Sequence, residues 1–281
     1  MESFYTREDS YPSTAITEPS RASFVSGPAT AGVWDPRFQH AGPPSALLAR
    51  QMMQHHPREG FRLADIHVDI LGPVPVAGLE VRTELIRGGR SMDLLQATAF
   101  SADHPDRPVL QARAWRILRA PEDYPRSIGR RDAGAPAVLP DDLPAGGRGL
   151  SAIAEAHLGG YTEAVEWRYM EGAPTELGPA FVWGRVRIPL VAGEEIAPWE
   201  RLLVLADSAG GLSLPVDTSR YRFINCDLHV ALDRDPEGEW IRMNAQSIAT
   251  PGHGGIVNNE LADVHGVLGT GLQTMVAAHL G

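Results

Sequence analysis

Asp207 is the residue whose surroundings point most clearly to chemistry. The five residues before it, 202–206, are all apolar. Its carboxylate therefore either reaches a cleft or is buried at a cost in desolvation free energy. A carboxylate held at a cleft can act as a general base on water. The structural alternative is a carboxylate that ends or caps a helix in front of Ser208 and Gly210.

Gln273 is the second polar side chain in an apolar setting, because it lies within the small and apolar run 267–275. A buried primary amide needs hydrogen-bond partners, and a water shared by Gln273 and Asp207 would satisfy both side chains. The alternative is an exposed glutamine on a strand.

Several other chemistries are excluded by missing motifs. The sequence has no G-x-S-x-G elbow, no HExxH pair and no Walker A motif. The glycines of 252–255 and 266–271 lack the strand and helix context of a dinucleotide site, and His55, His56 and His253 have no companion ligands at metal spacing. We therefore expect neither a cofactor nor a metal.

Composition and charge set the class of protein. The 281 residues carry 25 Lys+Arg against 35 Asp+Glu, a net charge of −10, which argues against a nucleic-acid partner. Hydrophobic residues at 43% and charged residues at 21% are typical of a globular protein. Cys226 is the single cysteine, and the sequence shows neither a signal peptide nor a membrane span. These observations predict a cytoplasmic protein with no membrane association.

A Pro- and Gly-rich stretch at 121–160 predicts a linker between two domains, 1–120 and 161–281. The hydrophobic periods predict the same order of elements on both sides, a helix followed by strands. In the first segment the helix spans 45–53 and the strands span 66–70, 79–86, 91–101 and 109–118. In the second segment two strands fall within 166–189, a helix covers 199–210, and strands follow at 228–232, 240–248 and 266–276.

The two segments also match residue by residue. Residues 66–68 (Ile-His-Val) correspond to 228–230 (Leu-His-Val), so that His67 and His229 are offset by 162 residues, and 109–110 correspond to 267–268 at an offset of 158. Two copies of one α+β unit, each a helix wrapped by an antiparallel sheet, explain this order.

Five motifs, in order along the chain, carry a resemblance to a known family. They are WDPRFQHAGPPSALLARQ (34–51), VPVAGLEVRTELIRGGRSM (74–92), ERLLVLADSAGG (200–211), INCDLHVALDRDPEGEW (224–240) and GVLGTGLQ (266–273). With the duplication, they resemble the double-hotdog acyl-CoA thioesterases related to acyl-CoA thioesterase II. The resemblance implies a tandem double hotdog that hydrolyses acyl-CoA, or an acyl group on a carrier protein.

The resemblance also implies site residues. Asp207 would be the general base, acting on a water held by Gln273 and Asn225. Asn225 stands where the best-known member has a hydroxyl residue, and a turn asparagine is the alternative reading. The first copy has Trp115 and Leu63 at the positions of Gln273 and Asn225, which predicts one site per chain.

The helix start at 40–43 supplies the remaining site residues. A helix N-terminus has unpaired N–H groups, so the Gly42 N–H is expected to stabilise the oxyanion, while His40 lines the cleft. Asp35 and His40 also form a D-x4-H pattern that resembles hotdog enoyl-CoA hydratases or dehydratases, although Arg37 and Phe38 replace the Asn and Pro of that motif. A third alternative is a hotdog protein that binds an acyl or polyketide intermediate without hydrolysing it.

The negative net charge requires a local group of cations if the substrate carries phosphates. The candidates are Arg87, Arg90 and, in the linker, Arg126, Arg130 and Arg131. Exposed sheet edges often pair between subunits, so a homodimer of the double unit is also expected.

Overall fold

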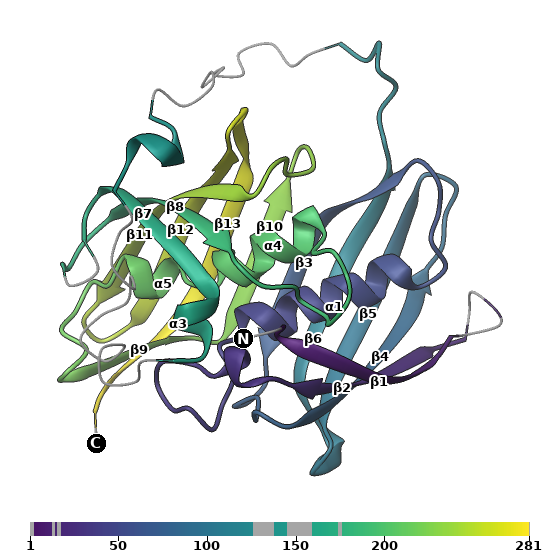
Figure 1. Cartoon of the computed structure of the whole chain (residues 1–281), viewed down its shortest axis with the longest axis horizontal. Helices are drawn as coiled ribbons and strands as arrows, with labels where there is room; N and C mark the ends of the chain where they lie inside the picture. Colours follow the sequence, from purple (N-terminus) through teal and green to yellow (C-terminus); the bar gives the residue numbers. More distant parts are fainter. Residues whose placement is uncertain are drawn as a thin grey trace.

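The fold is dominated by one antiparallel sheet (Figure 1). The computed structural model describes residues 3–12, 15, 18–125, 138–144, 159–173 and 176–280. These residues form 13 strands in the order β1-β2-β4-β5-β6-β3-β10-β13-β12-β11-β8-β7, with β9 paired to β13. Parts of the predicted linker, 126–137 and 145–158, lie outside the described residues, and so do Arg126, Arg130 and Arg131.

The elements of the first segment follow the predicted order of a helix and then strands, preceded by two further strands. They are β1 (Tyr5–Tyr11), β2 (Ser20–Ser26), the 3-10 turn η1 (Pro28–Thr30), α1 (Gly42–Gln54), β3 (Phe61–Ile70), β4 (Gly78–Arg87), β5 (Met92–Ser101) and β6 (His104–Leu118). The predicted helix over 45–53 and the four predicted strands are confirmed.

The second segment repeats this order with two strands that the sequence analysis did not predict, β9 and β12. Its elements are η2 (Pro140–Asp142), α3 (Tyr161–Ala164), β7 (Val165–Glu171), β8 (Ala180–Val186), α4 (Pro198–Ala206), α5 (Ala209–Leu212), β9 (Tyr221–Asn225), β10 (Asp227–Leu232), β11 (Trp240–Thr250), β12 (Gly254–Asp263) and β13 (Gly266–His279).

Two helices, α1 and α4, pack against the sheet. Strand β5 shows why, because its residues alternate between buried and partly exposed and so present one apolar face inward. Helix α1 is buried along most of its length and packs against β4, β5 and β6, while α4 packs against β8 and β11. The two helices also contact each other, and Figure 1 shows both near the middle of the molecule.

The two segments join where β3 and β10 pair in the centre of the sheet. His67 lies opposite His229 in this antiparallel register, with ring centroids 5.5 Å apart. The pair that the sequence comparison matched at an offset of 162 residues is therefore a pair of neighbours in space. Across the same junction Arg62 donates to Asp235 at 3.1 Å and to the Leu232 carbonyl at 3.1 Å.

The beginning of β1 forms a second connection between the segments. The Phe4 and Tyr5 N–H groups donate to the carbonyls of Pro189 and Leu190 at 3.0 and 2.9 Å, and Tyr5 accepts from the Ala192 N–H at 2.8 Å. Both Phe4 and Tyr5 are fully buried. The Tyr5 hydroxyl donates to Gln39 Oε1 at 2.6 Å, so this strand also supports the chain beside residue 40.

Glu166 on β7 is held by three arginines. Arg185 and Arg168 donate to its carboxylate at 2.6 and 3.0 Å, and Arg187 lies 3.2 Å from it. Burial by itself raises the pKa of Glu166, but the hydrogen bonds from the arginines outweigh burial and lower the pKa from 4.5 to about 2. The folded state therefore keeps this carboxylate ionised at pH values where the unfolded chain protonates it.

We expect Glu166→Gln to lower the free energy of unfolding at neutral pH by about 1–3 kcal/mol, because it removes the charge of a buried carboxylate that three partly exposed arginines contact. The depressed pKa gives stabilisation that is complete above pH 4.5 and is lost as the pH falls towards 2. The difference between wild type and variant should shrink over that window in urea unfolding. Glu239→Gln is the matched control, since its exposed carboxylate faces the same Arg185. A difference that stays constant with pH would contradict the assignment.

Candidate active site

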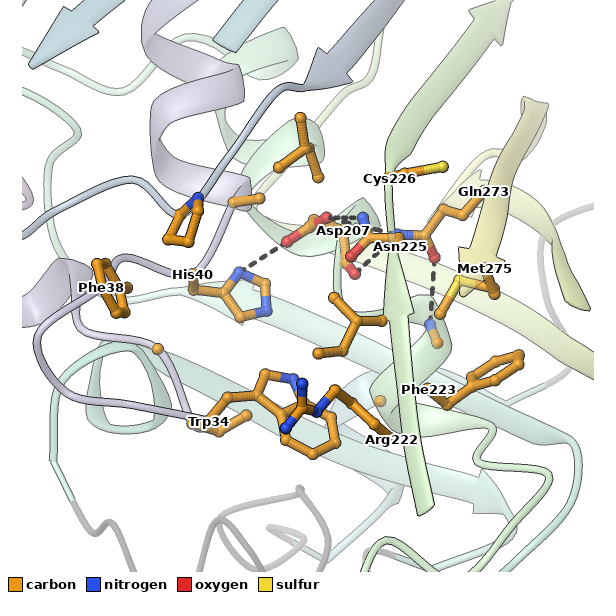
Figure 2. Close-up of a pocket in the computed structure, with 18 of the residues that line it drawn as sticks. Trp34, Phe38, His40, Asp207, Arg222, Phe223, Asn225, Cys226, Gln273 and Met275 are labelled. Carbon is orange, nitrogen blue, oxygen red and sulfur yellow. Dashed lines mark hydrogen bonds and ion pairs between the residues drawn. The ribbon is translucent and has the colours of Figure 1, made fainter. Parts of the chain in front are cut away.

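A cavity of about 610 Å³ lies between the two segments. Its wall combines residues 32–35, 38–41, 70 and 72–74 of the first segment with residues around 207, 222–226 and 273 of the second. The lining is largely apolar. Its polar members are Asp35, Gln39, His40, Asp207, Ser208, Arg222, Asn225, Cys226 and Gln273. Figure 2 labels six of them, namely His40, Asp207, Arg222, Asn225, Cys226 and Gln273.

Asp207 occupies a break between two helices. The predicted helix over 199–210 ends at Ala206 in the structure, and α5 begins at Ala209. The Asp207 side chain is only 4% exposed, and the polar groups that its carboxylate contacts among the described residues are side chains of the site. A carboxylate at the C-terminal end of a helix opposes the helix dipole, so helix capping does not explain its position.

Asn225 and Gln273 both contact Asp207 from the second segment. Asn225 Nδ2 donates to Asp207 Oδ1 at 2.8 Å. Gln273 Nε2 donates to the Asp207 backbone carbonyl at 3.1 Å and lies 3.4 Å from Oδ1, while its Oε1 accepts from the Gly210 N–H at 3.2 Å. Gln273 is 2% exposed, so it is not a surface glutamine. The structure thus brings together the three residues that sequence reasoning assigned to catalysis.

His40 approaches the same carboxylate from the first segment. Its Nδ1 lies 3.0 Å from Asp207 Oδ2, and the Gly42 N–H donates to the same nitrogen at 3.2 Å. Burial lowers the pKa of His40 below its ordinary value of 6.5, and the Asp207 carboxylate opposes this shift. No described residue hydrogen-bonds the other ring nitrogen, Nε2, and Figure 2 shows the ring at the pocket wall.

Tyr161 holds the His40 ring in place. The two rings stack with centroids 3.7 Å apart and an angle of 3° between their planes. The Tyr161 hydroxyl donates to the Val204 carbonyl at 2.8 Å and lies 2.7 Å from the Ser208 hydroxyl. Burial raises the pKa of this phenol, which stays neutral. One tyrosine therefore connects the histidine of the first segment to the turn that carries the aspartate.

Gly42 is placed by a close contact between helices. A Cβ atom built on Gly42 would overlap the carbonyl oxygen of Val204 on α4, so glycine permits α1 to begin against the backbone of α4. Its N–H points at His40, and Gly42 is buried behind the residues that line the cavity. Its predicted oxyanion role stays a prediction.

The remaining candidates of the sequence analysis among the described residues do not contact Asp207 in the structure. Asp35 lines the cavity but forms an ion pair with Arg37 at 2.6 Å, whereas the carboxylate beside His40 belongs to Asp207. Arg87 and Arg90 are exposed and do not line the cavity. Arg222 does line it and was not predicted, because nothing in its local sequence distinguishes it from a surface arginine.

Two wider searches of the described residues bear on the kind of site. No group of three or more His, Cys, Asp or Glu side chains in this part of the chain is arranged to hold a metal ion. Within the same residues, every helix is too short or too polar to cross a lipid bilayer.

Family comparisons cover most of the chain. The family model for the acyl-CoA thioesterase N-terminal domain matches residues 30–117, and the model for the acyl-CoA thioesterase C-terminal domain matches residues 132–277. No curated protein sequence matches the chain.

Solved structures show a likeness of fold over nearly the full length. A conserved protein with a hot dog fold from Alicyclobacillus acidocaldarius is 16% identical with a TM-score of 0.69, covering 94% of this chain and 93% of its own. A candidate thioesterase from Novosphingobium aromaticivorans is 18% identical with a TM-score of 0.69, covering 97% and 98%. Acyl-CoA thioesterase II TesB2 from Mycobacterium marinum is 14% identical with a TM-score of 0.62, covering 97% of each chain.

Proposed function

This chain belongs to the acyl-CoA thioesterase family, and we propose that it hydrolyses the thioester of an acyl-CoA, or of an acyl group on a carrier protein, to a free acid and a thiol. The observation that carries the proposal is the buried Asp207 carboxylate at the cavity wall, contacted by His40, Asn225 and Gln273. A modest base suffices for this reaction, because a thioester carbonyl is already electrophilic.

We further propose that the fold is a tandem double hotdog, with units at 1–120 and 161–281 and a linker at 121–160. In each unit the sheet would wrap a central helix, α1 or α4. The matched pair His67 and His229 across the β3–β10 junction supports this division. Pairing of exposed sheet edges would join two such chains as a homodimer.

In the proposed mechanism Asp207 takes a proton from a water molecule as the water oxygen bonds to the thioester carbonyl carbon. Asn225 and Gln273, whose amides already point at Asp207, would position this water and the carboxylate. The carbon–sulfur bond of the tetrahedral intermediate then breaks. The departing thiolate takes up the proton, which returns Asp207 to its ionised form.

His40 gives the transferred proton a second place to reside. Its Nδ1 is 3.0 Å from Asp207 Oδ2, so the proton can pass between the two groups without movement of either residue. A protonated Nδ1 no longer accepts the Gly42 N–H, which would release that N–H for the proposed oxyanion role. Gly42 does not line the cavity, so this role requires the oxyanion to approach beside His40.

This mechanism predicts a particular pH dependence. The reaction requires that the pair formed by Asp207 and His40 can accept a proton from water. Protonation of His40 would block this, and burial lowers the pKa of His40 below 6.5. We expect kcat/KM to be constant near neutral pH and to decline as the pH falls, with a midpoint below 6.5. In His40→Gln the residual activity should lose this part of the profile. An acid limb that is unchanged in the variant would contradict the role of His40.

The test of the function itself is thiol release from short, medium, long and aromatic acyl-CoAs, followed with a thiol-reactive dye. Release with at least one ester class is expected. No release by folded protein would overturn the proposal. The same samples incubated with an enoyl-CoA, monitored for loss of the conjugated double bond, would then test hydration, the alternative suggested by Asp35 and His40. Stabilisation against heating by acyl-CoA with neither reaction would indicate a binding role.

A further inference from the structure

Arg222 is the cavity-lining cation without a counter-ion among the described residues. The other charged groups of the lining are engaged, since Asp35 pairs with Arg37 and Asp207 pairs with His40. The Arg222 guanidinium forms no hydrogen bond or ion pair with any residue in the part of the chain that the structure describes. An arginine at a mostly apolar cavity, in a protein of net charge −10, needs an explanation.

The position of Arg222 places it at the outer part of the cavity. It lies on β9, three residues before Asn225, which corresponds to roughly 10 Å along a strand. Arg222 is exposed, whereas Asp207 is buried. Figure 2 shows the guanidinium on the side of the cavity away from Asp207. A ligand that reacts at Asp207 would therefore pass Arg222 with the part that remains in water.

The chemistry of a thioester substrate identifies the group that meets Arg222. The acyl chain is apolar and favours the apolar lining, while the pantetheine arm leads outward to a phosphate. The planar guanidinium binds phosphate through paired N–H groups. Trp34, 38% exposed, lines the same cavity and offers an aromatic surface to the arm.

We propose that Arg222 binds the phosphate at the end of the pantetheine arm, which coenzyme A and the prosthetic group of a carrier protein share. This inference rests on the proposed function, because it assumes that the acyl group enters as a pantetheine thioester. It makes Arg222 a residue for substrate recognition that leaves the chemistry at Asp207 untouched. Its charge also explains how an acidic protein admits an anionic substrate.

The experiment is a calorimetric titration of the full chain with free coenzyme A, phosphopantetheine and pantetheine, which lacks the phosphate. We expect Arg222→Gln to weaken coenzyme A and phosphopantetheine about 10- to 100-fold and to leave pantetheine unchanged. Arg222→Lys should recover part of the loss. Arg220→Gln is the matched control, because this exposed arginine is two residues away and does not line the cavity. Raised salt should weaken coenzyme A binding to wild type more than to Arg222→Gln.

The outcomes separate this inference from the proposed function, since binding is measured without turnover. Unchanged coenzyme A affinity in Arg222→Gln, an equal loss with pantetheine, an equal loss in Arg220→Gln, or no binding by wild type would each overturn it. Loss confined to coenzyme A, with phosphopantetheine unaffected, would place Arg222 at the nucleotide and overturn the assignment to the arm. Normal binding without thiol release would instead refute hydrolysis and leave the role of Arg222 intact.

Discussion

Replacing Asp207 by asparagine is expected to lower kcat for thioester hydrolysis by about 10²- to 10⁴-fold, the usual cost of losing a general base. Asparagine has nearly the same shape and keeps an oxygen that can accept from Asn225, 2.8 Å away. The substitution removes the negative charge that accepts the proton of water and that faces His40. Steady-state thiol release measures the effect.

A structural effect of this substitution must be distinguished from a chemical one. Asp217→Asn is the matched control, because Asp217 is an exposed carboxylate that accepts from Ser219 and does not line the cavity. We expect the control to retain wild-type kcat. The thermal unfolding midpoint and the affinity of Asp207→Asn for coenzyme A should stay close to wild type. Retained turnover in Asp207→Asn would refute the mechanism.

Gly42→Ala is expected to destabilise the protein by about 3 kcal/mol or more, the upper part of the range for overpacking. Helix propensity alone predicts the opposite sign, because alanine is favoured over glycine in a helix by about 0.5–1 kcal/mol. The contact decides, since the new methyl group would overlap the Val204 carbonyl oxygen and lie 3.0 Å from its carbon. Both neighbouring atoms belong to the backbone of α4 and cannot rotate away.

Urea unfolding of wild type, Gly42→Ala and Gly72→Ala measures this effect. Gly72 is the matched control, because a Cβ atom there would meet nothing within 4 Å and its backbone is not in the left-handed region. We expect the control to stay within about 0.5 kcal/mol of wild type. If both variants have the same stability, the tight approach of α1 to α4 is not a constraint on the fold.

Strands with one buried face could be predicted from the sequence, and strands at irregular or edge positions could not. β5 shows the two-residue period clearly. β1 reads YTREDSY, in which only the first residue is buried, so its strand conformation depends on pairing with β2. β12 was not predicted because its first residues are glycines that bring no side chains to an apolar face, yet it pairs along nearly its whole length with β11 and β13.

The candidate site divides in the same way. Asp207 and Gln273 could be found because a charge and an amide stand out in apolar surroundings. The contact between His40 and Asp207 could not be predicted, because the two residues are far apart in the sequence. Hydrophobic periodicity identifies helices and strands but does not show which distant residues meet. Tyr161 was missed for the same reason, since its importance comes from stacking on His40. The partners of these residues are set by packing between the two segments.

The buried start of β1 has a consequence for how the protein is made. Phe4 and Tyr5 are synthesised before the backbone that pairs with them, at 189–192, which follows more than 180 residues later in the chain. At about 5–20 residues per second, roughly 10 to 40 s separate the two segments during translation. The side chains of Phe4 and Tyr5, which are fully buried in the folded protein, therefore lack their packing partners from the second segment during this interval. A chaperone that binds nascent chains would have access to them until residues 189–192 are made.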